Sequence, residues 1–189
     1  MGNETIIYTM RHGQKGKGEN PPLTELGATQ VSDSIKSHLK GISFTAIYHG
    51  DRQRHYDSAI VAKSILPGYI HFFSTPALTL DGILGIERIN EYVKQASNHP
   101  AGPAAGFRID NWWNMCAPLL LNLQDRFGEF LRQVVKGSTI LAICSSPLPE
   151  AVAINKDRTW LLDEAGIIKY TLNDALEIIK QENIFDGFS

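Results

Sequence analysis

Short apolar runs alternate with longer segments of helical periodicity over residues 6–73 of the chain. The runs are rich in β-branched and aromatic side chains, as is typical of buried strands, and they are residues 6–9, 44–48 and 69–73. Residues 24–41 carry apolar side chains at helical spacing, with Thr24 suited to cap that helix and Gly41 to end it. Residues 52–65 predict a second helix. The alternation predicts parallel β-α-β units, and therefore an α/β protein of three α/β/α layers with a mostly parallel central sheet.

The second half of the chain departs from this rhythm and then returns to it. Residues 75–117 hold several glycines and prolines, and we expect a partly helical excursion that lies over the strand ends. A long helix with one apolar face is predicted for residues 118–135, and a buried strand for residues 139–143. Residues 167–171 predict the last strand, followed by a final helix over residues 173–181 that its first residue can cap.

Composition limits the class of protein. The chain has 189 residues, 43% of them hydrophobic, and a net charge of −2 with acidic and basic residues interspersed. It suits one domain spanning residues 1–189, without the basic footprint of nucleic-acid binding or of a polybasic membrane surface. No apolar run has membrane-spanning length, and the N-terminus lacks the regions of a signal peptide. Cys116 and Cys144 form neither a disulfide framework nor a metal-ligand cluster, so we expect a cytoplasmic protein without a metal.

The first apolar run leads directly into an arginine, a histidine and a glycine, Arg11, His12 and Gly13. Ligands of α/β folds bind at such strand ends, where the backbone is exposed at one rim of the sheet. An arginine beside a histidine at that rim indicates an anion clamp next to a neutral nucleophile or an acid–base group.

These residues, together with two further segments, resemble the histidine phosphatase superfamily, the phosphoglycerate-mutase-like group. Residues 11–13 match its Arg-His-Gly signature at the end of the first strand. Residues 23–30 match the "LTxxGxxQ" start of its first helix. Residues 47–54 lie where members carry a Ser-Ser-x-x-x-Arg segment, which aligns Arg54 with the second phosphate-binding arginine. The resemblance extends over roughly residues 5–150.

The resemblance implies a phosphoryl-transfer site. His12 would attack phosphorus through a neutral imidazole nitrogen and form a phosphohistidine that water then hydrolyses. Arg11 and Arg54 would hold the phosphoryl oxygens, with Gly13 beside them in the phosphate-binding set. No metal or cofactor is implied, because phosphoryl transfer needs chiefly positioning and neutralisation of charge. The implied ligand is a small phosphorylated molecule or a phosphate ion.

One position departs from the family pattern. Members carry a second histidine, followed by glycine, at the end of the strand before Pro147; here Ser145 and Ser146 stand in those places. A serine hydroxyl can bond a phosphate oxygen, but it cannot neutralise charge. Loss of one such donor typically costs on the order of 100- to 1,000-fold in rate. We therefore expect phosphate binding together with weakened catalysis.

Two further residues bear on catalysis. Asp81 fits the spacing of the general acid of the family, with Glu87 as the second candidate, although an aspartate beside glycine is also common in turns. His49 lies at the end of the second strand, where relatives carry serine, and could bind phosphate and supply part of the missing positive charge. The alternative interpretation of His49 is a loop histidine that faces solvent. The alternative interpretation of Arg54 is a helix residue that is exposed to solvent and binds no phosphate.

Three functions are consistent with this pattern. The first is a phosphate-ester-binding, histidine-phosphatase-like protein that acts as a weak phosphomonoesterase through phospho-His12. The second is a catalytically inactive member that serves as a phospholigand sensor or a protein-interaction module, as the loss of the second histidine at Ser145 suggests. The third is a mutase of the phosphoglycerate type. The substrate would be selected by residues 75–117, where little matches the family, and the pattern predicts neither the substrate nor an oligomeric state.

Overall fold

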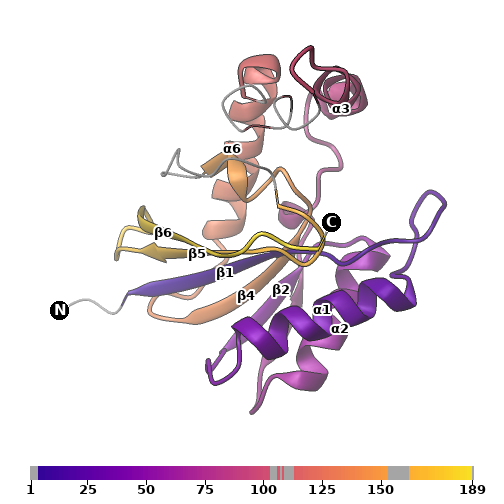
Figure 1. The fold of residues 1–189 in the computed structure, drawn as a ribbon. Helices are drawn as coiled ribbons and strands as arrows, with labels where there is room; N and C mark the ends of the chain where they lie inside the picture. The colour runs from indigo at the N-terminus through magenta and orange to yellow at the C-terminus, as the bar shows by residue number, and fades with distance from the viewer. Residues whose placement is uncertain (1–3, 103–105, 107, 109–112, 153–161, 189) are drawn as a thin grey trace.

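A six-stranded sheet forms the centre of the computed structural model, which describes residues 4–102, 106, 108, 113–152 and 162–188 (Figure 1). The strands are β1 (Thr5–Arg11), β2 (Ala46–His49), β3 (His71–Ser74), β4 (Thr139–Cys144), β5 (Ile167–Leu172) and β6 (Ile178–Phe185). Their order is β3-β2-β4-β1-β5-β6. The pairs among the first four are parallel, whereas β5 and β6 are added antiparallel. The prediction of a mostly parallel sheet is confirmed.

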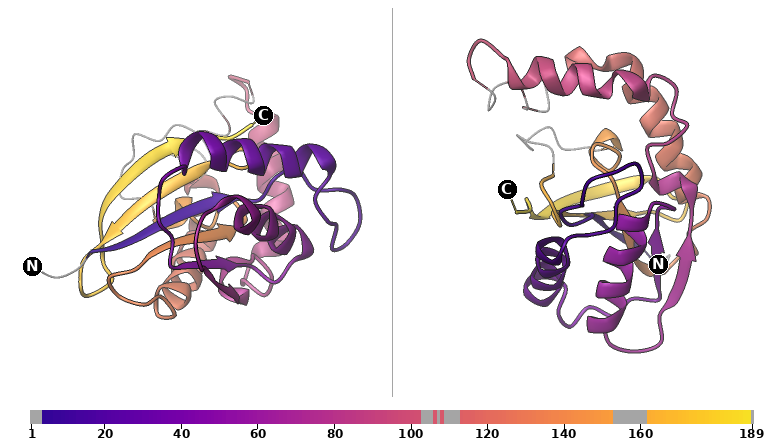
Figure 2. Two further views of the ribbon diagram at one scale, coloured as in Figure 1. Left: turned by 90° about the horizontal axis from the view of Figure 1, so that it is seen from below. Right: turned by 90° about the vertical axis from the view of Figure 1, so that its right-hand side faces the viewer.

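Helices cover both faces of this sheet (Figures 1 and 2). Helices α1 (Glu25–His38) and α2 (Gln53–Ile65) lie on one face, and α6 (Ala117–Leu131) lies on the other. Helix α3 (Ile89–Ser97) stands beyond α6, at the outer end of the molecule in Figure 1. The short helices are η1 (Pro76–Leu78), η2 (Ile86–Arg88) and η3 (Glu150–Val152). The predicted three-layer arrangement is therefore confirmed.

Alternation along the central strands divides the core into two clusters. Ile7 of β1 packs with the α6 side, whereas Tyr8 and Met10 pack with the α1 and α2 side. In β4, Ile140, Ala142 and Cys144 belong to the α6 side, and the residues between them belong to the other. Because successive side chains of a strand point to opposite faces, this division also fixes where the residues just after β1 and β4 point.

The excursion after β3 is partly helical, as expected. Within residues 75–117 the structure places η1, η2 and α3, and residues 103–105, 107 and 109–112 lie outside the described part of the chain. In the described ranges, no helix is both long enough and apolar enough to cross a membrane.

The helix predicted for residues 173–181 is wrong. The Asn173 side chain does not cap a helix; its Oδ1 accepts hydrogen bonds from the backbone N–H groups of Ala175 and Glu177, both at 2.9 Å, and closes a turn. Leu176 in that turn has a φ of 62°. The chain then returns as β6 against β5, where Ile178 and its apolar neighbours pair in a two-stranded extension of the sheet. An Asx turn and a helix cap share the same residue type, so the sequence pattern favoured the wrong element.

The loop that follows β1 is held against the start of α1. The Thr24 Oγ1 accepts a hydrogen bond from the Gly27 N–H at 3.0 Å and caps α1, and the Thr24 N–H donates to the Gln14 carbonyl at 3.0 Å. The two glycines here touch through their backbones. A Cβ on Gly13 would lie 2.2 Å from the Gly27 oxygen, and a Cβ on Gly27 would lie 2.1 Å from the Gln14 oxygen. Only glycine permits this approach at either position.

We expect Gly27→Ala to destabilise the protein by about 1–3 kcal/mol, because the added methyl group meets backbone atoms that cannot move aside. Gly128→Ala is the matched control, since it also lies within a helix and its nearest neighbour would be the Arg132 side chain at 3.8 Å. The control should instead gain about 0.5–1 kcal/mol from helix propensity. Urea unfolding of both variants measures the difference; equal stabilities would contradict the close contact.

Candidate functional site

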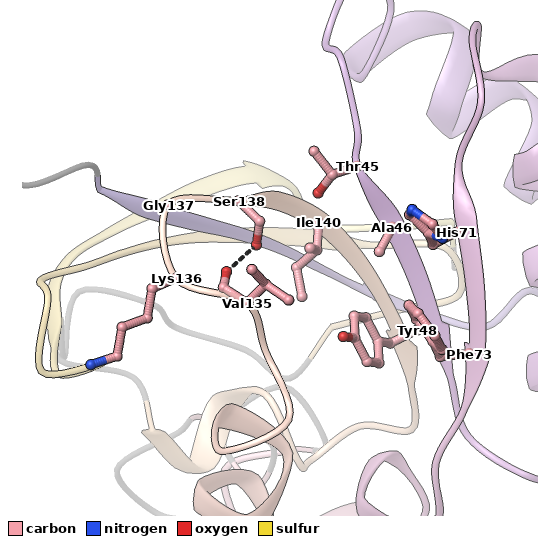
Figure 3. Close-up of a pocket in the computed structure, with 10 residues that line it drawn as sticks. All are labelled: Thr45, Ala46, Tyr48, His71, Phe73, Val135, Lys136, Gly137, Ser138 and Ile140. Carbon is pink, nitrogen blue, oxygen red and sulfur yellow. Dashed lines mark hydrogen bonds between the residues drawn. The ribbon is translucent and has the colours of Figure 1, made fainter.

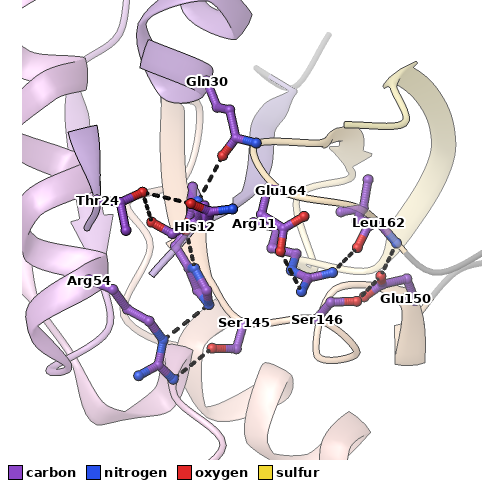
Figure 4. A network of polar contacts seen from close by, with 12 residues as sticks. Arg11, His12, Thr24, Gln30, Arg54, Ser145, Ser146, Glu150, Leu162 and Glu164 are labelled. Carbon is purple, nitrogen blue, oxygen red and sulfur yellow. Dashed lines mark hydrogen bonds and ion pairs between the residues drawn. The ribbon is translucent and has the colours of Figure 1, made fainter. Parts of the chain in front are cut away.

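Three side chains meet where β1 and β4 end and α2 begins (Figure 4). His12 follows β1, Ser145 follows β4, and Arg54 lies in the first turn of α2. The Arg54 Nε–H donates to His12 Nε2 at 3.0 Å, and Arg54 Nη2 lies 3.5 Å from Ser145 Oγ. Parallel pairing produces this meeting, since Arg11 is in register with Cys144 and the next residues are His12 and Ser145.

His12 is buried and held in one tautomer. Its Nδ1 lies 2.8 Å from the Gly13 carbonyl oxygen, which can only accept, so Nδ1 carries the proton. The lone pair of Nε2 therefore faces Arg54. Burial, which is the largest cause, and the charges of Arg54, Arg11 and Lys15 together lower the pKa of His12 to about 3, although the hydrogen bond to Gly13 opposes them. The imidazole is thus neutral, with its nucleophilic nitrogen directed at a cation.

Arg54 lies partly buried beside this imidazole. In the ranges that the structure describes, no carboxylate lies within ion-pairing distance of its guanidinium. A guanidinium withdrawn from water in this way has unused donors for an anion. Charge-assisted hydrogen bonds from arginine to a phosphate are among the stronger polar contacts in proteins.

The structure does not bring the Arg11 guanidinium to His12. Arg11 Nη1 donates to the Leu162 carbonyl at 2.5 Å, and Nη2 pairs with Glu164 at 3.4 Å (Figure 4). The alternation of β1 explains this, because Arg11 and His12 are consecutive and point to opposite faces of the sheet. Ser146 follows the same rule, since it turns from Ser145 toward this second group and donates to the buried Glu150 carboxylate.

The two acidic candidates do not contact His12. Asp81 forms an ion pair with Arg52, and this hydrogen bond lowers the pKa of the Asp81 carboxyl. A carboxyl with a lowered pKa is ionised at neutral pH, whereas a general acid must carry a proton. Glu87 is exposed on η2. Neither carboxyl is therefore arranged as a general acid in this structure.

His49 is buried rather than exposed, but it belongs to another surface. Its Nδ1 lies 2.7 Å from the Gly50 carbonyl oxygen, and its ring packs against Tyr56 and Phe72 at centroid distances of 5.5 and 4.9 Å. It lines a cavity of about 490 Å³ with Asp51 and other residues of that side. The structure therefore contradicts the solvent-facing alternative for His49, and it brings no His49 contact to His12.

A residue that sequence reasoning missed completes the cluster. His55 is fully buried; its Nε2 lies 2.8 Å from Ser145 Oγ, and its ring centroid lies 5.3 Å from that of His12. Burial lowers the pKa of His55 well below the ordinary value, and the charges of His12 and Arg54 act in the same direction. The available signal was its place directly after Arg54, since adjacent helix residues are about 100° apart and can share one rim.

A further cavity of the described residues has different walls. The cavity in Figure 3, about 430 Å³, lies at the opposite ends of β2 and β4, between Tyr48, Phe73 and Ile140. Its walls are largely apolar, and the Lys136 side chain points away from them in the figure. Nowhere in the described residues do three or more histidine, cysteine or acidic side chains gather as a metal site would require. The arrangement at His12 is therefore the candidate active site.

The chain is similar to known proteins in its fold, but not in its sequence. No family model matches the chain, and no curated protein sequence matches it. Among solved structures, YhfR from Bacillus stearothermophilus is 13% identical with a TM-score of 0.62, over 98% of each chain. A mycobacterial glucosyl-3-phosphoglycerate phosphatase is 13% identical with a TM-score of 0.57, over 98% of this chain and 100% of its own.

The protein histidine phosphatase SixA, solved as a complex with tungstate, is 16% identical with a TM-score of 0.52, over 94% of this chain and 96% of its own. These structures agree with this chain along nearly its whole length, although few residues are shared. The likeness to these structures, together with the mostly parallel sheet between helices, shows that the chain has the phosphoglycerate-mutase-like fold.

Proposed function

We propose that the protein binds a phosphate monoester at His12, Arg54 and Ser145 and hydrolyses it slowly through phospho-His12. The observation that carries this proposal is the 3.0 Å contact between the Nε2 lone pair of His12 and the Arg54 guanidinium. A phosphoryl group that replaces this contact meets a nucleophile on one side and a cation on the other. Relatives in fold support it, since SixA was solved with tungstate and a mycobacterial glucosyl-3-phosphoglycerate phosphatase with VO3.

The reaction has two steps. In the first, the lone pair of His12 Nε2 forms a bond to phosphorus while the ester P–O bond breaks and its electron pair leaves with the alcohol oxygen. The Gly13 carbonyl keeps the proton of the imidazole on Nδ1 and stabilises the positive ring that forms. Arg54 donates to the phosphoryl oxygens. In the second, water attacks phosphorus, the P–N bond breaks, phosphate leaves and the neutral imidazole returns.

The expected substrate class follows from the positions of the two candidate general acids, Asp81 and Glu87. Neither Asp81 nor Glu87 is arranged to protonate a leaving oxygen. Aryl phosphates, whose leaving oxygen needs little protonation, should therefore react faster than alkyl phosphates. The natural ligand is a small phosphorylated molecule or a phosphate ion. Cys116 and Cys144 are buried and are not joined in a disulfide, which fits our proposal that the protein acts in the reducing cytoplasm.

A second candidate function is binding without turnover. The ion pair of Asp81 and the serine at position 145 both favour it, because they remove the general acid and one cation from the family pattern. The protein would then sense a phosphorylated ligand through the same pocket. Phosphoenzyme formation at His12 separates the two functions.

We expect wild-type protein to hydrolyse an aryl phosphate and to form an acid-labile phosphoenzyme, and His12→Ala to do neither. Arg54→Lys keeps the charge but loses the fork of donors, and should lower kcat/KM by about 10- to 100-fold. Steady-state hydrolysis and ³²P labelling at neutral pH measure both. Hydrolysis that survives His12→Ala would contradict the proposed nucleophile. Tungstate binding without any label in the wild type would favour the sensor.

The neutral imidazole gives a second prediction. With a pKa of about 3, the His12 ring should show no change of its Cε1–H chemical shift between pH 8 and pH 5. The unfolded chain, in contrast, takes up protons near pH 6.5, so stability falls as pH drops from 6.5 toward 3, by about 1.4 kcal/mol per pH unit for this group. NMR titration of the folded protein, with His12→Gln to assign the signal, tests it. A midpoint above pH 6 would contradict the burial argument.

A further inference from the structure

Ser145, which stands where the family pattern has a histidine, is in contact with the imidazole of His55 from helix α2. Helix α2 supplies His55, whose Nε2 is 2.8 Å from Ser145 Oγ, while the preceding residue, Arg54, reaches the same oxygen at 3.5 Å. The ring is fully buried and lies next to the ring of His12. Position 145 itself carries only a short side chain. Ser145 and His55 are therefore in direct contact at the end of β4.

The direction of the hydrogen bond between these residues follows from the other ring nitrogen. His55 Nδ1 is buried and has no hydrogen-bond partner among the described residues. The backbone of Gly50 closes this side of the ring, since a Cβ there would lie 2.3 Å from Nδ1. A buried N–H without a partner is rarer and costlier than a bare lone pair, so Nδ1 is the unprotonated nitrogen. Nε2 therefore carries the proton and donates it to Ser145.

This direction decides what the serine can do. A hydroxyl has two lone pairs and one proton. His55 Nε2 and Arg54 Nη2 both face the Ser145 oxygen as donors, so the hydroxyl proton is left for a third partner. The phosphoryl group that we propose at His12 would be this partner, because the His12 ring lies next to the His55 ring and the Arg54 guanidinium contacts both His12 and Ser145. Accepting two hydrogen bonds also strengthens a hydroxyl as a donor.

We propose that His55 is a positioning residue that fixes the Ser145 hydroxyl as a hydrogen-bond donor to the transferring phosphoryl group. The pair thereby replaces the second histidine of the family pattern with a relay of two neutral groups. The inference rests on the proposed function, because it assigns a role within the same pocket. It agrees with the slow turnover that we propose, since the pair supplies a donor but adds no positive charge.

Substitutions that move or remove one donor test this relay. The amide nitrogen of glutamine overlies Nε2 of histidine, and that of asparagine overlies Nδ1. We expect His55→Asn and His55→Phe to lower kcat/KM for an aryl phosphate by about 5- to 30-fold, the value of one hydrogen bond of 1–2 kcal/mol. His55→Gln should recover most of this loss. Tungstate affinity by calorimetry should follow the same order.

A double-mutant cycle separates positioning from packing. If His55 acts through Ser145, then Ser145→Ala loses as much as Ser145→Ala combined with His55→Phe. If His55 only packs, adding His55→Phe to Ser145→Ala should cause a further loss of activity. Activity should then follow the volume of the side chain at position 55, so that Phe ranks above Gln. Thermal unfolding of each variant shows whether it is folded. If a variant at position 55 does not fold, the loss of activity in Ser145→Ala still tests the proposed donor.

The outcomes distinguish this inference from the proposed function. Activity in the wild type with Asn, Gln and Phe variants all equal to it overturns the relay and leaves phospho-His12 in place. Additive losses in the cycle do the same. A wild type that neither turns over the ester nor binds tungstate overturns both.

Discussion

The parallel register of β1 and β4 is the constraint on which the site depends. Arg11 pairs with Cys144, so the chains leave the sheet side by side and place His12 next to Ser145. Alternation then places the four residues at these strand ends on two faces of the sheet. His12 and Ser145 turn toward α2, while Arg11 and Ser146 turn toward Glu164 and Glu150. A shift of either strand by one residue would turn that strand's residue away from its partner and separate His12 from Ser145.

Burial gives the first of these sets its chemistry. Two histidines that are withdrawn from water stay neutral beside Arg54, which keeps its charge and has no carboxylate partner in the described chain. His12 is neutral, and the positive charge of Arg54 is not balanced by a carboxylate of the described residues, so this group of side chains can accommodate an anion. The ion pair of Asp81 with Arg52 stands outside this set and confines its carboxylate away from the imidazole. This arrangement is the basis of our proposal that the site binds a phosphoryl group.

The sequence predicted the layers, because buried strands and helices are visible as apolar runs and helical periodicity. That Arg54 and Ser145 belong beside His12 came from the resemblance to a known family, and the structure brings the three side chains together. The sequence did not predict the direction of Arg11, although the alternation of β1 contained that information. His55 was missed because its role depends on a contact across 90 residues with Ser145. The helix expected at residues 173–181 was wrong because Asn173 closes a turn with the same side chain that caps a helix. Local sequence patterns predict helices and strands, whereas the site depends on contacts between residues that are far apart in the chain.

The most direct test of the central claim is a crystal structure of the protein with vanadate, which mimics a phosphoryl group in transfer. The account predicts vanadium within bonding distance of His12 Nε2, with its equatorial oxygens facing the Arg54 guanidinium and the Ser145 hydroxyl. Vanadate bound at Arg11 or Arg52 instead, with the contact between His12 and Arg54 unbroken, would contradict it.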